Sequence, residues 1–298
     1  MPALVECVPN ISEGRRAEII SAVASAITAV PGVRLLDQTS DADHNRSVFT
    51  FAGEPEAVAR AAHGLVDVSL REIDMRVHKG EHPRLGAVDV VPFVPISGIA
   101  MNECVALAHR FGKEVAARHR VPVYFYAEAA LRPDRVKLGD IRNKVQYEGL
   151  AEALSTTHVP DAGPAAFNER AGAVVVGARP FLIAFNIELD TTDLKLAKRI
   201  AKEIRESSGG LPAVQALGFE LNDPPRVQVS MNLLDFRRTS LSQVWREVER
   251  RATEAGVKIL RGELIGLVPL DAALQVTADA LKLDRFDRTR VIEARFLE

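Results

Sequence analysis

Ionisable side chains are concentrated in one short segment, residues 73–90, with the sequence IDMRVHKGEHPRLGAVDV. Gly80 and Pro83 interrupt any regular secondary structure there. A histidine that such a backbone holds beside charged groups can transfer protons near neutral pH. Neighbouring cations would favour the neutral imidazole that a base requires, and could bind the carboxylates of a substrate. The segment therefore predicts acid–base catalysis on an anionic substrate, with Arg76, Lys79 and Arg84 as the local cations.

Two other interpretations of this segment remain open. It can be a solvated connection, although its length is unusual for a plain loop within a compact domain. The letters HKGEH also match the H-x-x-E-H zinc signature, which places both imidazoles on one face of a helix. Gly80 between the histidines and Pro83 after them make that helix poor, and no third ligand is recognisable downstream. No metal is therefore expected.

The composition narrows the class of protein. The 298 residues are 47% hydrophobic and 26% charged, as in an ordinary soluble globular protein. A net charge of −2 disfavours nucleic-acid binding. Cys7 and Cys104 are too few for a disulfide framework and lie in apolar runs, which predicts buried thiols in a reducing compartment. We expect a cytoplasmic protein without membrane partners, because neither a spanning apolar run nor a signal peptide is recognisable.

The elements that must position the charged segment follow the same order in both halves. In the N-terminal half, five strands are expected, in this order: residues 4–10, residues 33–38, a strand from Val48, residues 88–95 and residues 121–130. Helices are expected after the first, third and fourth of these strands. In the C-terminal half, strands are expected at residues 179–189, 214–221, 227–234 and 257–269, with helices capped by Thr192 and Ser240 and a last helix at 270–283. Both halves therefore predict the ferredoxin-like order β-α-β-β-α-β.

Two such halves form an α+β protein with helices on the outer faces. The bare sheet faces can be buried against each other or can hold a ligand between them. A linker rich in Pro, Gly, Ala and Asp is expected at residues 155–172. In the strand at 227–234, Val227, Val229 and Met231 alternate with polar residues, so one face of this strand is expected to be wet or to line a cavity.

Six segments together resemble the glutamate formimidoyltransferase family, the folate-dependent enzymes of histidine breakdown. They are LVECVPNISEG, DMRVHKGEHPRLGAVDVVPFVP, VPVYFYAEAA, GARPFLIAFNIEL, MNLLDF and LIGLVPL. The resemblance runs from Leu4 to about Leu274 and does not include the cyclodeaminase domain of some relatives. It implies two ferredoxin-like subdomains, at residues 1–160 and 173–284, joined by the segment 161–172. It also implies a substrate tunnel between their sheets and a homodimer.

The resemblance also implies the residues of the site. His82, the second histidine of the motif, is the catalytic residue. The folate-binding segment is Gly163, Pro164, Ala165, Ala166, Phe167, Asn168, Glu169, Arg170, Ala171 and Gly172. The candidate substrate-binding residues are Asp37, Asn45, Arg46, Lys79 and Arg84, of which Arg46, Lys79 and Arg84 would hold carboxylates. One position departs from the family pattern, because Thr39 stands where relatives carry an acid and acids follow only at Asp41 and Asp43.

The implied reaction is formimidoyl transfer from N-formimidoyl-L-glutamate to N5 of tetrahydrofolate, the co-substrate, without a metal. His82 would take the N5 proton and give a proton to the departing glutamate nitrogen. Two alternatives remain. One is formyl transfer between 5-formyltetrahydrofolate and glutamate, and the other is a folate-binding protein without catalysis.

Overall fold

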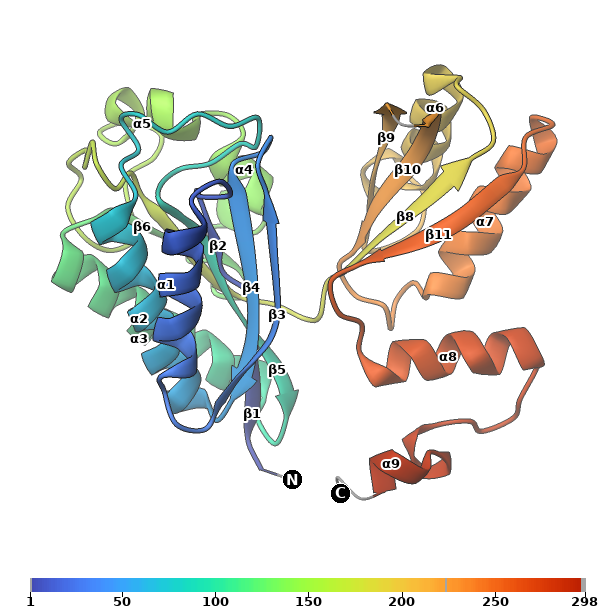
Figure 1. Cartoon of the computed structure of the whole chain (residues 1–298), viewed down its shortest axis with the longest axis horizontal. Coiled ribbons are helices and arrows are strands. Elements are labelled where there is room, and N and C mark those ends of the chain that lie inside the picture. Colours follow the sequence, from blue (N-terminus) through green and yellow to red (C-terminus); the bar gives the residue numbers. More distant parts are fainter. Residues whose placement is uncertain (1, 223, 296–298) are drawn as a thin grey trace. The chain divides into compact units, whose positions relative to one another are not determined.

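The computed structural model describes residues 2–222 and 224–295, in two compact units, Met1–Arg179 and Pro180–Glu298. Each unit contains one β-sheet and several helices (Figure 1). The expected α+β class is confirmed. In the described residues no helix is both long and apolar enough to cross a membrane.

The first unit is built on one mixed sheet. Strands β1 and β2 lie between β4 and β5, β3 pairs with β4 at one edge, and β7 and β6 continue the sheet beyond β5 in parallel. The elements are β1 Leu4–Cys7, β2 Asn10–Ile11, α1 Ala17–Thr28, β3 Val33–Asp41, β4 Arg46–Gly53, α2 Pro55–Glu72, β5 Val88–Ser97, α3 Met101–His119, β6 Val123–Ala127, η1 Pro133–Arg135, α4 Leu138–Arg142, α5 Gln146–Ala153 and β7 Val174–Ala178.

Apolar side chains cover both faces of this sheet near β5, β6 and β7. The stripe Ile20, Val23 and Ile27 of α1 packs with α2 and α3 into the main core on one face. On the other face, Tyr124 of β6 and Val175 of β7 pack against the segment that contains α4 and α5. Continuous apolar runs are typical of parallel strands that are buried on both faces. The segment with α4 and α5 therefore lies on this second face of the sheet, next to the candidate site.

The first unit extends further along the chain than the expected subdomain 1–160. Strand β7 was not expected, and its residues were assigned to the second subdomain, 173–284. It lies between β5 and β6 because its backbone pairs with both, with Val175 opposite Val90 and Tyr124. The chain therefore divides after Arg179. As a consequence, the segment 161–172 is a connection within the first unit, between α5 and β7.

The second unit has one antiparallel sheet in the order β11-β8-β10-β9. Its elements are β8 Ile183–Leu189, α6 Leu194–Ile204, η2 Glu206–Ser208, β9 Val214–Asn222, β10 Pro225–Leu233, α7 Leu241–Glu254, β11 Ile259–Ile265, α8 Leu270–Leu281, η3 Arg288–Arg290 and α9 Ile292–Arg295. Ser240 caps α7 as expected, by accepting the backbone N–H of Gln243. The expected cap Thr192 was wrong, because the side chain of Asp193 accepts the N–H groups of Lys195 and Leu196 and begins α6.

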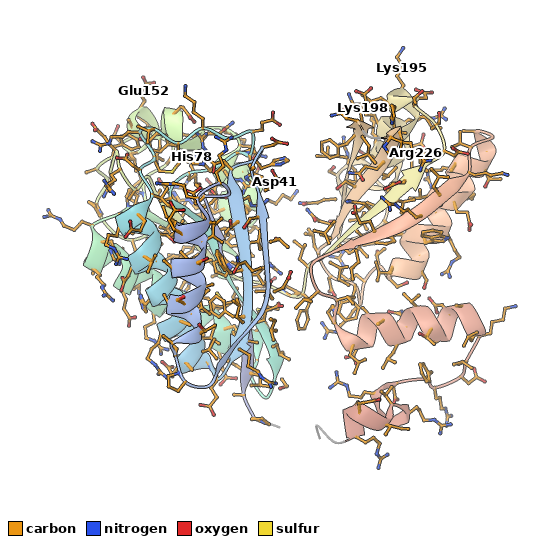
Figure 2. The ribbon with its side chains drawn as sticks, in the orientation of Figure 1. Asp41, His78, Glu152, Lys195, Lys198 and Arg226 are labelled. Atoms are coloured by element: carbon orange, nitrogen blue, oxygen red, sulfur yellow. The ribbon has the colours of Figure 1, made fainter. Side chains whose placement is uncertain are left out.

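The expected alternation in β10 is confirmed. Val227, Val229 and Met231 are buried against α6 and α7, whereas the residues between them are half-buried on the other face. That other face carries the buried Glu188 of β8, which pairs with Arg261. Figure 2 labels Arg226 at the start of β10, and Lys195 and Lys198 on α6.

Candidate active site

The segment 74–87 between α2 and β5, here called the histidine loop, contains no helix or strand. It packs on the turn 42–45 between β3 and β4. A Cβ atom on Gly80 would lie 2.3 Å from the carbonyl oxygen of His44, so only glycine permits this approach. The N–H of Glu81 donates to the carbonyl of Asp43 at 3.4 Å. The irregular backbone that Gly80 and Pro83 predicted is thus held by backbone contacts. Figure 2 labels His78 of the histidine loop and Asp41 at the end of β3.

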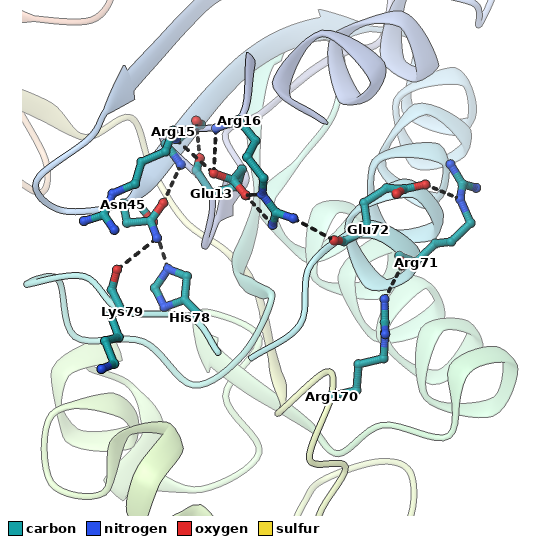
Figure 3. Close-up of polar contacts among 11 residues, drawn as sticks. Glu13, Arg15, Arg16, Asn45, Arg71, Glu72, His78, Lys79 and Arg170 are labelled. Carbon is teal, nitrogen blue, oxygen red and sulfur yellow. Dashed lines mark hydrogen bonds and ion pairs between the residues drawn. The ribbon is translucent and has the colours of Figure 1, made fainter. Parts of the chain in front are cut away.

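Asn45 holds the turn, the histidine loop and the β2–α1 connection together. Its φ of 47° is left-handed, a conformation that asparagine tolerates better than most residues. Its Oδ1 accepts the N–H of Gly14 at 2.9 Å, and its Nδ2 donates to the carbonyl of Lys79 at 2.9 Å. Its own carbonyl accepts Nε2–H of His78 at 3.1 Å (Figure 3). Asn45 therefore has a structural role that its match to the family did not specify.

Both ring nitrogens of His78 are used. Nε of Arg84 donates to Nδ1 of His78 at 3.3 Å, which requires the proton on Nε2, where it is donated to Asn45. Burial lowers the pKa of His78, in agreement with this neutral tautomer. Residues 78–82 do not form the helix that the zinc signature needs, and both nitrogens of His78 have partners within the protein. In residues 2–222 and 224–295, no group of three or more His, Cys, Asp or Glu side chains could hold a metal ion.

His82 is half-buried beside a small cavity of about 10 Å³, which has room for roughly one water molecule. Burial, and then the charges of Arg46 and Arg142, lower the pKa of His82 to about 3. The ring is therefore neutral at pH 7. The His44 ring lies 6.3 Å from it, centroid to centroid. The cavity is lined by Ile11, Ser12, His44, Asn45, Arg46, His78, His82, Arg84 and Asp89.

Arg46 of β4 and Arg142 of α4 bring two guanidinium groups to this site. Nη1 of Arg142 donates to Oδ2 of the buried Asp89 at 2.6 Å, and Oδ1 of Asp89 accepts the N–H of Leu85 at 2.9 Å. Nη2 of Arg46 donates to Oδ1 of Asn10. Burial lowers the pKa of Arg46 to about 10, and the charge of Arg142 acts in the same direction. The Nε atoms of both arginines are buried and make no hydrogen bond within the described residues.

Sequence reasoning missed the position of Arg142. From the sequence, Arg135 and Arg142 in the stretch RPDRVKLGDIR could attract the anionic folate tail, and a plain solvated surface was an equally good interpretation. Instead Arg142 is half-buried and pairs with the distant, buried Asp89, which no local pattern reveals. Arg135 in the same stretch is buried, where its guanidinium pairs with Asp161 and lies 5.1 Å from the centre of the Tyr124 ring.

The structure brings only some of the candidate substrate residues to the cavity. Asn45, Arg46 and Arg84 line it with His82. The side chain of Lys79 is exposed, and only its backbone carbonyl is engaged. Asp37 lies on β3 opposite Thr50, next to a bulge, and does not line the cavity. Thr39 pairs with Val48 further along the same strand.

The segment Gly163–Gly172 ends against the histidine loop. Gly172 has a φ of +71°, and a Cβ atom there would lie 2.1 Å from the carbonyl oxygen of Leu85. The carbonyl of Ala171 accepts the N–H of Ala87 at 2.8 Å, and the carbonyl of Leu85 accepts the N–H of Ala173 at 3.0 Å. The two segments are far apart in sequence and therefore lie side by side only in the folded structure.

Tyr147 at the start of α5 contacts both segments. Its N–H donates to the carbonyl of Arg84 at 2.8 Å, its ring lies 5.3 Å from that of Phe167, and its hydroxyl donates to the carbonyl of Glu169. Arg170 makes a further contact, since its Nη2 donates to the carbonyl of Arg71 at 2.5 Å (Figure 3). Residues 163–166, before these contacts, are exposed.

These features define an α+β protein with a neutral imidazole near two half-buried guanidinium groups, an arrangement suited to proton transfer on an anionic substrate. The chain matches the model of the formiminotransferase domain, N-terminal subdomain, over residues 4–179, and that of the formiminotransferase domain over residues 184–287. The chain belongs to the formiminotransferase family, as its motifs had indicated.

Curated relatives match along nearly the whole chain. A glutamate formimidoyltransferase of Thermoplasma acidophilum is 44% identical over 98% of this chain and 97% of that protein. One of Streptococcus pyogenes is 41% identical over 96% of each. The formimidoyltransferase-cyclodeaminase of Rattus norvegicus is 47% identical over 93% of this chain, which spans 52% of that longer protein.

Proposed function

We propose that His82 is the general acid and base in transfer of the formimidoyl group from N-formimidoyl-L-glutamate to N5 of tetrahydrofolate. The transfer itself follows from the relatives of matching length, which are glutamate formimidoyltransferases. The observation that supports the role of His82 is its neutral, half-buried ring near the cations Arg46, Arg84 and Arg142. A base must be unprotonated before the reaction, and a neutral imidazole meets this condition.

His82 moves one proton in two steps. It accepts the proton from N5 as the bond from N5 to the formimidoyl carbon forms. It then donates a proton to the glutamate nitrogen as the bond from that nitrogen to the formimidoyl carbon breaks. Glutamate leaves as the amine and His82 returns to its neutral form, so the protons balance. Such a group typically contributes about 10²–10⁴-fold to the rate.

The segment Gly163–Gly172 is proposed to bind tetrahydrofolate. Three contacts support its placement near His82: its end is hydrogen-bonded to Ala87, Phe167 stacks near Tyr147, and Tyr147 in turn bonds Arg84. A backbone held at both ends, with the exposed residues 163–166 between, suits a flat ligand that is gripped mainly by shape.

The candidate substrate residues separate into two roles in this proposal. Arg46 holds a carboxylate of the donor. Arg84 keeps the histidine loop in place, because its guanidinium already binds Glu148 and His78. Lys79 and Asp37 remain candidates for more distant parts of the substrates, and Asn45 shapes the turn.

The finer fold and the assembly are part of the same proposal. We expect each unit to be a ferredoxin-like subdomain, with the first extended by α3, β6 and β7. The strand orders β5-β1-β4-β3 and β11-β8-β10-β9 support this, since both place the first and third strands of the motif in the middle. A substrate tunnel between the sheets, a homodimer and a cytoplasmic location stay predictions.

A product assay tests the proposed function. Purified protein is incubated with tetrahydrofolate and either N-formimidoyl-L-glutamate or N-formyl-L-glutamate, and the folate product is identified by mass spectrometry. We expect 5-formimidoyltetrahydrofolate from the first donor and little product from the second. A preference for the formyl donor would favour the alternative transfer. Tetrahydrofolate binding without either product would favour the folate-binding protein without catalysis.

A further inference from the structure

The charges around the cavity do not cancel. Arg46, Arg84 and Arg142 supply three positive charges, while the buried Asp89 and Glu148, whose side chain is 61% exposed, supply two negative ones. Glu148 is taken by Arg84, and Asp89 lies within hydrogen-bond distance of Arg142. The charge of Asp89 also acts on Arg46, as does that of Asp41, whose side chain is 54% exposed and pairs with His44. Arg46 and Arg142 therefore share the single buried charge of Asp89.

The hydrogen bonds of the two guanidinium groups are also incomplete. Arg46 has the neutral amide oxygen of Asn10 as its partner, and Arg142 has one oxygen of Asp89. Their Nε atoms are buried and unpaired within the part of the chain that the structure describes. A buried donor without an acceptor is costly, and two like charges close together add to this cost. Such sites are stabilised by an anion that accepts from both groups.

We propose that Arg46 and Arg142 together bind the α-carboxylate of the donor beside His82, with Asp89 as the residue that positions Arg142. This inference rests on the proposed function. The choice of the α-carboxylate follows from the substrate's covalent structure. The glutamate nitrogen that His82 must protonate and the α-carboxylate are attached to the same carbon, whereas the γ-carboxylate is two carbons further away. A cation pair next to the reacting imidazole is therefore closer to the α-carboxylate when the donor chain is extended.

Binding of the carboxylate would change His82 itself. The titratable and charged groups around His82 come from the turn 42–45, the histidine loop, β4, β5 and α4. They are His44, Arg46, His78, Arg84, Asp89 and Arg142. Burial, and then the charges of Arg46 and Arg142, hold the pKa of His82 low in the absence of an anion. A carboxylate between them would offset their charge and raise this pKa toward neutrality, where an imidazole exchanges protons most effectively. The donor would thereby activate the base that acts on it.

The test uses three unreactive ligands and the full chain. N-acetyl-L-glutamate carries both carboxylates, N-acetyl-L-2-aminobutyrate only the α-carboxylate and 4-acetamidobutyrate only the γ-carboxylate. Their affinities are measured by calorimetry for the wild type, Arg46→Gln and Arg142→Gln. The control is Arg132→Gln, which removes an exposed arginine that pairs only two residues away, with Asp134. Thermal unfolding checks that each variant is folded, and Arg46→Lys or Arg142→Lys replaces the glutamine variant at the same position if that variant is not folded.

We expect each glutamine substitution to weaken the affinity for the two ligands with an α-carboxylate at least tenfold, and to change the affinity for 4-acetamidobutyrate less than twofold. In the control Arg132→Gln, all three affinities should stay within twofold of the wild type. In the wild type, NMR of labelled histidine should show the pKa of His82 rising when N-acetyl-L-glutamate binds. Unchanged affinity in both variants, or a bound ligand that leaves His82 unshifted, would overturn the proposal. None of these readouts requires turnover. An inactive protein that passes them would therefore contradict only the proposed function, and an active one that fails them only the carboxylate site.

Discussion

The guanidinium of Arg84 binds both carboxylate oxygens of Glu148, with Nη2 to Oε1 at 2.6 Å and Nη1 to Oε2 at 3.0 Å. This bidentate pair joins the histidine loop to α5 across 64 residues of sequence. The remaining Nε of Arg84 fixes the ring of His78, and the neighbouring Tyr147 contacts the segment 163–172. One ion pair therefore holds the loop of the proposed catalytic residue next to the proposed folate-binding segment.

Removing the carboxylate of Glu148 should destabilise the protein and weaken its use of tetrahydrofolate. Glu148→Gln leaves the guanidinium of Arg84, whose side chain is 10% exposed, without its counter-charge. We expect a loss of about 1–3 kcal/mol in the free energy of unfolding and a higher KM for tetrahydrofolate. Urea denaturation and steady-state kinetics measure the two effects. Glu152→Gln, an exposed position on the same helix that Figure 2 labels, is the matched control. Equal behaviour of both variants would show that the ion pair has no role.

Removing the imidazole of His82 should affect turnover far more than folding. For His82→Ala we expect kcat to fall by about 10²–10⁴-fold, with little change in tetrahydrofolate binding. The reason is that the proposed role of His82 is proton transfer and not contact with the pterin. His63→Ala is the control, since His63 pairs with Glu114 outside the cavity. If His82→Ala turns over like the control, His82 is not the acid–base group.

His82 should also make stability depend on pH. Its pKa is about 3 when folded, below the usual value of about 6.5 that it regains on unfolding. The unfolded chain therefore binds the proton first, and stability is lost as the pH falls below about 6.5 toward 3. The difference amounts to at most about 2 kcal/mol at pH 5. Urea denaturation at pH 7 and pH 5 should show a smaller loss for His82→Gln than for the wild type, and parallel losses would contradict the buried neutral ring.

The close approach of Gly172 to Leu85 predicts a strict requirement for glycine. Gly172→Ala adds a Cβ atom that would lie 2.1 Å from a carbonyl oxygen, in a left-handed conformation. We expect a loss of about 2–4 kcal/mol in the free energy of unfolding and weaker tetrahydrofolate binding. Gly32→Ala separates the two causes, because Gly32 has a φ of +83° but nothing within 4 Å of its Cβ position. That control should lose only about 1 kcal/mol, and an equal loss in both would exclude the contact with Leu85 as the cause.

The sequence predicted most elements because their signals are local. The helical stripe Ile20, Val23 and Ile27, the alternation in β10 and the cap Ser240 each depend on residues a few positions apart. The free cysteines are also buried, as expected, and burial raises the pKa of Cys104 to about 11. Strand β7 was missed because VVVGA is too short an apolar run to be distinguished from a linker without its partners β5 and β6.

The sequence by itself determined the family, the two-part α+β organisation and the irregular loop that carries His82, since these follow from motifs and from the intrinsic preferences of glycine, proline and apolar residues. Only the tertiary structure decided which charges meet. Arg84 faces Glu148, Arg142 faces Asp89, and Arg46 comes from a separate strand. Burial and the summed charge of groups far apart in the chain determine the protonation of His82, and no local pattern encodes that sum.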